Sequence, residues 1–179
     1  VLSNVTVPLQ GAIDTAVIGN LGDAAYLAAV GLGAVLFSLT FGIFNFLQFS
    51  SSGLSAQALG ACDGARVNGV LARGVLLALT IAAALIVMRG PLRDVGLSFF
   101  EGSDEVKRLA RVYVNIRIWG APAELANYAL LGWFSGQELT DRLFRQQLFL
   151  SVTNIALNLL FVLGLGFDID GVAAATVLA

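Results

Sequence analysis

The sequence predicts an all-α integral membrane protein, and three observations support this fold class. Of the 179 residues, 58% are hydrophobic and 12% are charged, whereas an ordinary soluble domain has about 25% charged residues. Mean hydropathy is +0.85. No charge lies between Asp23 and Asp63, a stretch longer than the roughly 20 apolar residues that one spanning helix needs. We therefore expect a multi-pass protein.

Charge-free runs and helix-breaking residues divide the chain into about six predicted transmembrane helices. We expect them to form a single lobe over residues 1–179. Both ends of the sequence fall within apolar runs, so the first and last helices are expected to be truncated. The predicted helices cover residues 1–18, 24–58, 67–88, 104–136, 146–167 and 171–179.

Local chemistry sets several of these boundaries. Pro91 is expected to stop the third helix, because proline has no backbone N–H to donate. Ser103 and Asp104 have the chemistry of a helix N-terminus, so the fourth helix is expected to begin near Asp104. The polar segment 137–145 is predicted to be a short connection before the uncharged fifth helix.

Composition also excludes several classes of function. The net charge is −2 and no basic patch is present, which argues against a nucleic-acid partner. One cysteine and no histidine exclude an internal disulfide framework, a Cys/His metal site and histidine-based catalysis. We therefore expect a protein that is not an enzyme, needs no cofactor and has the lipid bilayer as a partner.

Asp14 is the strongest candidate for a functional residue, because it lies in an apolar segment. A carboxylate in hydrocarbon costs about 2.5–3.5 kcal/mol and normally persists only where it faces a polar cavity. Gln10 lies one turn earlier on the same face, and Pro8 can bend the helix. Asp14 is predicted to bind and release H⁺ or Na⁺. The alternative is an aspartate that only reaches interfacial water through the nearby polar segment 19–23.

Asn154 and Asn158 form a second candidate group. They lie four residues apart in an uncharged span and therefore share a face. Their amide oxygens could bind Na⁺ or accept a hydrogen bond from a protonated aspartate. Hydrogen bonding between helices, at about 0.6 kcal/mol per bond, is an equally good explanation.

Arg117 and Glu124 are seven residues apart on one predicted helix, so we expect them on the same face. A structural polar network is favoured over a direct functional role, because charges within membranes usually pair. Phenylalanines of the second helix could line a pocket for an organic cation, but packing or contact with lipid is favoured for most of them. They are Phe37, Phe41, Phe44, Phe46 and Phe49.

Several segments together resemble the multidrug and toxic compound extrusion (MATE) family, in its DinF-like branch. Residues 8–22 resemble the first-helix motif of that branch, and residues 55–63 resemble the segment after its second helix. Residues 113–123, 154–158 and 171–176 match motifs of its fourth, fifth and sixth helices. The resemblance extends in order over essentially the whole chain.

This resemblance implies a twelve-helix exporter of two six-helix lobes, of which this chain would be the N-terminal lobe. Its partners would be the absent C-terminal lobe and a small organic, often cationic, substrate, exchanged for H⁺ or Na⁺. The expected location is the bacterial inner membrane. The family pattern assigns the coupling carboxylate to Asp14, with Gln10, Asn154 and Thr176 around it. Na⁺, if bound, would lie at Asp14, Asn154 and Thr176.

Two positions depart from the family pattern, and one of them is Gln10, which stands where some archaeal members have tyrosine. The family often has a second aspartate where this chain has Asn158, so a single carboxylate remains and H⁺ coupling is favoured. Pro8, Arg117 and Glu124 are then expected to have structural or gating roles. Two alternatives stay open: a lipid or lipid-linked precursor flippase, which would need an arginine-rich cavity, and a non-transporting membrane scaffold.

Overall fold

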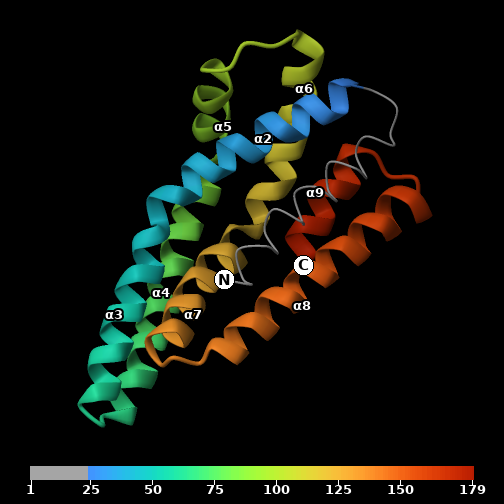
Figure 1. Cartoon of the computed structure of the whole chain (residues 1–179). Helices are drawn as coiled ribbons and strands as arrows, with labels where there is room; N and C mark the ends of the chain where they lie inside the picture. The colour runs from blue at the N-terminus through green and yellow to red at the C-terminus, as the bar shows by residue number, and fades with distance from the viewer. Residues whose placement is uncertain (1–23) are drawn as a thin grey trace. The chain divides into compact units, whose positions relative to one another are not determined.

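The computed structural model describes residues 24–179, and every regular element in this range is a helix (Figure 1). The predicted all-α fold is therefore confirmed. The predicted helix 1–18, with Pro8, Gln10 and Asp14, lies outside the described residues. In chain order the elements are α2 (Ala24–Gly42), η1 (Ile43–Asn45), α3 (Phe46–Gly60), α4 (Gly64–Val87), α5 (Arg89–Ser98), α6 (Asp104–Arg117), η2 (Ile118–Gly120), α7 (Ala121–Gly136), α8 (Thr140–Asn158), the π-helical turn η3 (Leu159–Gly164) and α9 (Ile169–Leu178).

Within residues 24–179, two helical stretches are long and apolar enough to cross a membrane. One is the run Ala24–Gly60, with 37 residues, in which the 3₁₀ turn η1 joins α2 to α3. The other is α4, with 24 residues. At about 1.5 Å per residue α4 is about 36 Å long, above the roughly 30 Å of a hydrocarbon core. The chain thus has a helix that can extend past the bilayer.

The described residues fall into two compact units. One unit contains residues 38–87 and 121–145, and its helices α3, α4 and α7 lie side by side (Figure 1). Small residues allow the close approach of α3 and α7. A Cβ added at Gly132 would lie 2.9 Å from the Cβ of Ser51, and one at Gly136 would lie 2.8 Å from the Cβ of Ser55. Such small-residue contacts are typical of helix packing in membranes.

A hydrogen bond also holds α7 against α4 within this unit. The indole Nε1 of Trp133 donates to the carbonyl oxygen of Val67 at 2.9 Å. A buried Trp usually finds a partner for its N–H, and here that partner is a backbone group near the start of α4. The contact lies at the end of the unit where α4 begins.

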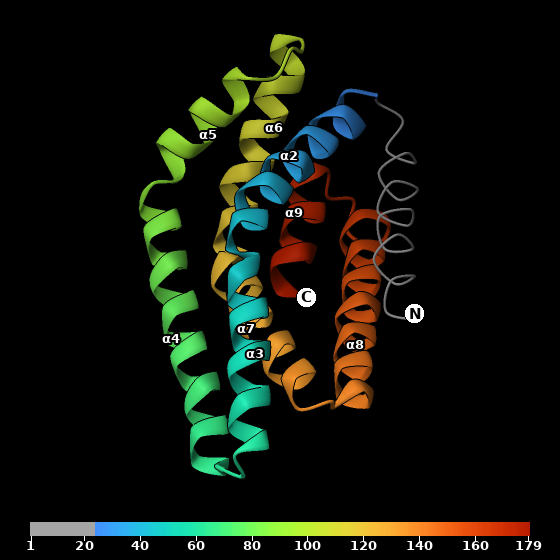
Figure 2. The same ribbon diagram turned by 60° about the vertical axis from the view of Figure 1, so that its left-hand side comes forward.

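The other unit contains residues 88–120 and 146–179, together with the start of α2. Its α6 and α9 pack side by side, and α5 packs along α6 (Figure 2). The buried ring of Tyr113 on α6 fills the space beside Gly33 of α2, where an added Cβ would clash with it. The N-terminus of α6 is capped as its sequence suggests: the Ser103 side chain accepts from the N–H of Val106 at 3.3 Å.

Several observed helix bounds differ from the expected ones. A separate helix, α5, follows α4 directly, and Pro91 lies in its first turn, where a missing N–H costs nothing. The fourth helix is interrupted by η2. The segment 140–145, expected to be a connection, is the start of α8, with Asp141 in its first turn, where an acid favours a helix. The fifth helix ends in η3 rather than in regular α-helix.

Candidate functional site

The unit that contains residues 88–120 and 146–179, called the second unit below, has two amides on α8 as its most buried polar side chains. Asn154 is 1% exposed and Asn158 is fully buried. The Nδ2 of Asn158 donates to the Oδ1 of Asn154 at 3.1 Å. The predicted shared face is thus present as a direct contact, and Ser151, also buried, lies one turn earlier.

This contact determines what Asn154 can offer to a further group. Its carbonyl oxygen already accepts from Asn158, while its Nδ2 has no hydrogen-bond partner within the described residues. A buried donor that stays unsatisfied costs about 1–3 kcal/mol. The Asn154 amide is therefore a place where a hydrogen-bond acceptor would be stabilised.

A π-helical turn follows the amide pair at once. At the end of η3 the N–H of Leu165 donates to the carbonyl oxygen of Leu160 at 2.9 Å, which is the five-residue spacing of a π turn. Just beyond η3, the N–H of Phe167 donates to the carbonyl oxygen of Phe161 at 2.9 Å. Turns of this kind are rare and occur frequently at functional sites. Because η3 begins directly after Asn158, a change in its winding would act on the end of the helix that carries the amides.

Thr176 lies on α9 in the same unit and is half-buried. Its Oγ1 donates to the carbonyl oxygen of Val172 at 3.0 Å. This bond runs along its own helix and not to α8, and it leaves the hydroxyl oxygen as an acceptor. The threonine can therefore accept a hydrogen bond from a further group while its own hydroxyl stays bound to the backbone of α9.

Arg117, at the end of α6, lies over an aromatic ring of α2. Its guanidinium carbon lies 5.3 Å from the centre of the Phe37 ring. Phe37 meets Tyr113 edge-to-face, with ring centres 6.5 Å apart. A cation over an aromatic face is stabilised by the ring quadrupole. The arginine is thus shielded on one side by α2.

Glu124 is half-buried in the first turn of α7, in the other unit. The 3₁₀ segment η2 lies between it and Arg117, so their seven-residue spacing does not run through continuous α-helix. Of the five phenylalanines, Phe37 and Phe41 are buried, whereas Phe46 and Phe49 are exposed. Whether a phenylalanine is buried or exposed depends on which face of the helix packs against other helices. The composition of the helix does not show this.

A charged cluster on α5 lies outside the apolar spans. The Nε of Arg93 is 2.8 Å from Oδ1 of Asp94, and its NH1 donates to Oδ1 of Asn115 on α6 at 3.0 Å. The hydrogen bond from Arg93 holds the pKa of Asp94 below its usual range. A lowered carboxylate pKa means that the contribution of this pair to stability is present at neutral pH and is lost as pH falls through the folded-state pKa.

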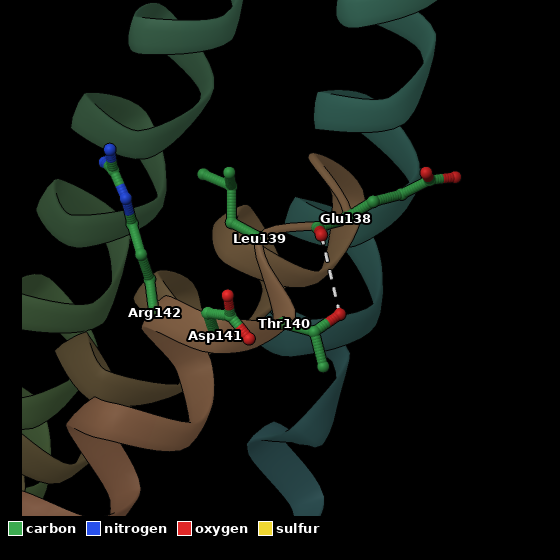
Figure 3. A pocket seen from close by; sticks show the side chains of 5 residues that line it. All are labelled: Glu138, Leu139, Thr140, Asp141 and Arg142. Carbon is green, nitrogen blue, oxygen red and sulfur yellow. Dashed lines mark hydrogen bonds between the residues drawn. The ribbon is translucent and has the colours of Figure 1, made fainter.

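The turn between α7 and α8 forms a shallow hollow of about 320 Å³. Figure 3 shows its lining, which consists of five consecutive residues, with the Glu138 side chain directed away from those of Asp141 and Arg142. The Oγ1 of Thr140 donates to the carbonyl oxygen of Glu138 at 3.4 Å (Figure 3). The hollow is thus a feature of the turn, and it lies outside the apolar part of the chain.

Sequence reasoning missed two features of the second unit. One is η3, because no residue pattern marks a π turn among the apolar residues 159–164. The other is a contact between Arg89 and Trp119, whose guanidinium carbon and ring centre are 5.4 Å apart. The sequence does place an arginine and a tryptophan near the ends of apolar segments. Both residues are typical of membrane interfaces, so a shared position there could have been predicted.

Long apolar helices, together with a buried amide pair and a helix interruption on another helix, are features of polytopic membrane transporters. The model of the MatE family matches residues 1–160, and the chain belongs to that family. It is 40% identical over its whole length to DNA damage-inducible protein F of Escherichia coli, and 31% identical over 96% of its length to Protein DETOXIFICATION 44, chloroplastic, of Arabidopsis thaliana. It spans 39% and 35% of these two relatives, respectively.

Solved structures of transporters also resemble this chain in fold. The fold is similar to that of a MOP superfamily transporter from Pyrococcus furiosus, for which a binding pocket of reverse polarity suggests a different function (TM-score 0.88, 25% identity). It is also similar to the outward-facing conformation of a multidrug resistance MATE family transporter (TM-score 0.87, 25% identity). Each comparison covers 98% of this chain and 39% of the other. The chain therefore has the fold of about two fifths of such a transporter.

Proposed function

We propose that this chain is the N-terminal lobe of a secondary active exporter in the bacterial inner membrane. The exporter moves drugs or other organic, often cationic, compounds outward in exchange for H⁺. Membership of the MatE family supports the transport of such compounds. A C-terminal lobe completes the protein in this proposal, because the chain spans 39% of its relative from Escherichia coli.

Asp14 is the coupling carboxylate in this proposal, and Gln10, Asn154, Asn158 and Thr176 form the polar surroundings of the cavity. When Asp14 is ionised, the cavity attracts a cationic substrate. Protonation from outside neutralises it, the first helix bends near Pro8, and the substrate is released. This is a population shift between two states of different proton affinity.

The buried Asn154 amide supports a place for it beside the coupling carboxylate. Its oxygen accepts from Asn158, and its Nδ2 has no hydrogen-bond partner among the described residues. Such a buried donor suits an ionised carboxylate or a substrate oxygen. In this proposal H⁺ is favoured over Na⁺ because Asp14 is the single carboxylate of the group.

The small number of candidate arginines supports an exporter over a flippase. A flippase would need an arginine-rich cavity to attract lipid phosphate, and Arg117 was the one candidate found in the sequence. Its guanidinium carbon lies 5.3 Å from the centre of the Phe37 ring. A structural or gating role for Arg117 is consistent with this packing.

Asp14→Asn in the full-length protein tests the proposal. We expect efflux driven by a pH gradient in reconstituted vesicles to be lost, while the amount of folded protein stays unchanged, because asparagine has a similar volume but cannot release a proton. Asp141→Asn is the matched control, since Asp141 is exposed in the first turn of α8. Unchanged efflux in Asp14→Asn would show that coupling lies elsewhere.

A further inference from the structure

The contact between Arg89 and Trp119 lies within one compact unit and near the end of an apolar span. Arg89 is the first residue of α5 and comes two residues after α4 ends at Val87. Trp119 lies in η2, between α6 and α7. The guanidinium carbon is 5.4 Å from the centre of the indole ring. Figure 2 shows α5 and α6, the helices adjoining the two residues, next to each other.

The length of α4 places Arg89, and with it this pair, at the level of lipid headgroups. The 24 residues of α4 are about 36 Å long at about 1.5 Å per residue, so Arg89 lies just beyond one hydrocarbon thickness of roughly 30 Å. Tryptophan and arginine are both common at this level of a bilayer.

Arg89 has donors available there. Both Arg89 and Trp119 are exposed, the latter by 55%, and so is the apolar neighbour Met88, by 58%. In the part of the chain that the structure describes, Arg89 has no ion pair. Arg93, one turn later, is bound to Asp94 and Asn115. The two arginines of α5 therefore differ. Arg93 binds other side chains of the protein, whereas Arg89 is exposed and can bind a ligand.

The geometry points to a binding site for the phosphate headgroup of an anionic phospholipid at Arg89 and Trp119. The Arg89 guanidinium lies over the indole ring and is exposed, so its N–H groups are accessible to phosphate oxygens, which a guanidinium can bind in a fork. Trp119 and Met88 offer an apolar surface for the start of the acyl chains. Arg89 holds the lipid by charge, and Trp119 orients the guanidinium.

Native mass spectrometry of the full-length protein, released from nanodiscs with equal amounts of phosphatidylglycerol and phosphatidylcholine, tests this site. We expect Arg89→Gln to lower retained phosphatidylglycerol by roughly fivefold, the factor for removing one basic residue from an anionic surface. Arg142→Gln, an exposed arginine of α8, is the matched control and should retain lipid as the wild type does. Equal retention in wild type and Arg89→Gln would overturn the proposal.

Tryptophan fluorescence provides a second, independent readout. Brominated phosphatidylglycerol should quench Trp119 more strongly than brominated phosphatidylcholine does, with the Trp119 signal isolated as the difference between wild type and Trp119→Phe. Trp133 is the internal reference, because its indole is bonded to the backbone of Val67. Arg89→Gln should remove the preference, whereas quenching of Trp119 by both lipids alike in wild type would contradict an anionic site.

Discussion

Gly132→Ala is expected to destabilise the protein by about 1–3 kcal/mol, the range for overpacking a close contact. The added Cβ would meet the carbonyl group of Gln48, with its carbon at 2.9 Å, and the Cβ of Ser51 at the same distance. The carbonyl group is part of the α3 backbone, so no side-chain rotation relieves the clash. The two helices must move apart, which weakens the contact that organises this unit.

The matched control for this change is Gly53→Ala on α3. Nothing lies within 4 Å of a Cβ added at Gly53, and the position is exposed. Because alanine favours a helix over glycine by up to about 1 kcal/mol, this variant should be neutral or slightly more stable. The thermal midpoints of the two purified full-length variants in detergent give the comparison. Equal midpoints would mean that α3 and α7 do not pack through Gly132.

Asn158→Asp is expected to make efflux respond to Na⁺. The introduced carboxylate, when ionised, cannot donate to Asn154, but it can accept from the Asn154 Nδ2, which lacks a partner among the described residues. The Asn154 amide would then turn over and present its oxygen. The change creates a second carboxylate and a free amide oxygen together, and such hard oxygen ligands suit a small cation.

Transport driven by a Na⁺ gradient at equal pH on both sides measures this effect in vesicles. The wild type should show little response and Asn158→Asp a clear one. Asn158→Leu is the control, because it removes the same hydrogen bond without adding a carboxylate. We expect it to lose stability, since the oxygen of Asn154 is left without its donor. Na⁺ dependence in the leucine variant, or its absence in the aspartate variant, would contradict this account.

The fold class could be predicted from composition, because a chain with few charges and long apolar runs is stable in a bilayer as a set of helices. Helix ends were harder to predict. Polar residues at 140–145 were expected to form a connection, yet they extend α8, since a helix that leaves the bilayer can continue in water. Pro91 was expected to stop a helix, and it lies in the first turn of the next one.

The candidate site was predictable where residues share one helix. The spacing of Asn154 and Asn158 predicted a shared face, and the two side chains are hydrogen-bonded. Contacts between helices gave no such signal. Neither the stacking of Arg117 on Phe37 nor that of Arg89 on Trp119 can be derived from spacing along the chain, because each depends on how separate helices rotate against each other.

The π-helical turn η3 makes the end of α8 tolerant of a change in length. A bond from residue i to residue i+5 accommodates one residue more than a regular α-helical turn. Deleting one residue from 159–164 would therefore convert the turn into regular α-helix and absorb the gap where it occurs. The register of Asn154 and Asn158 before the turn and of α9 after it could then both be kept. Relatives that differ by one residue at this point could share the same amide pair.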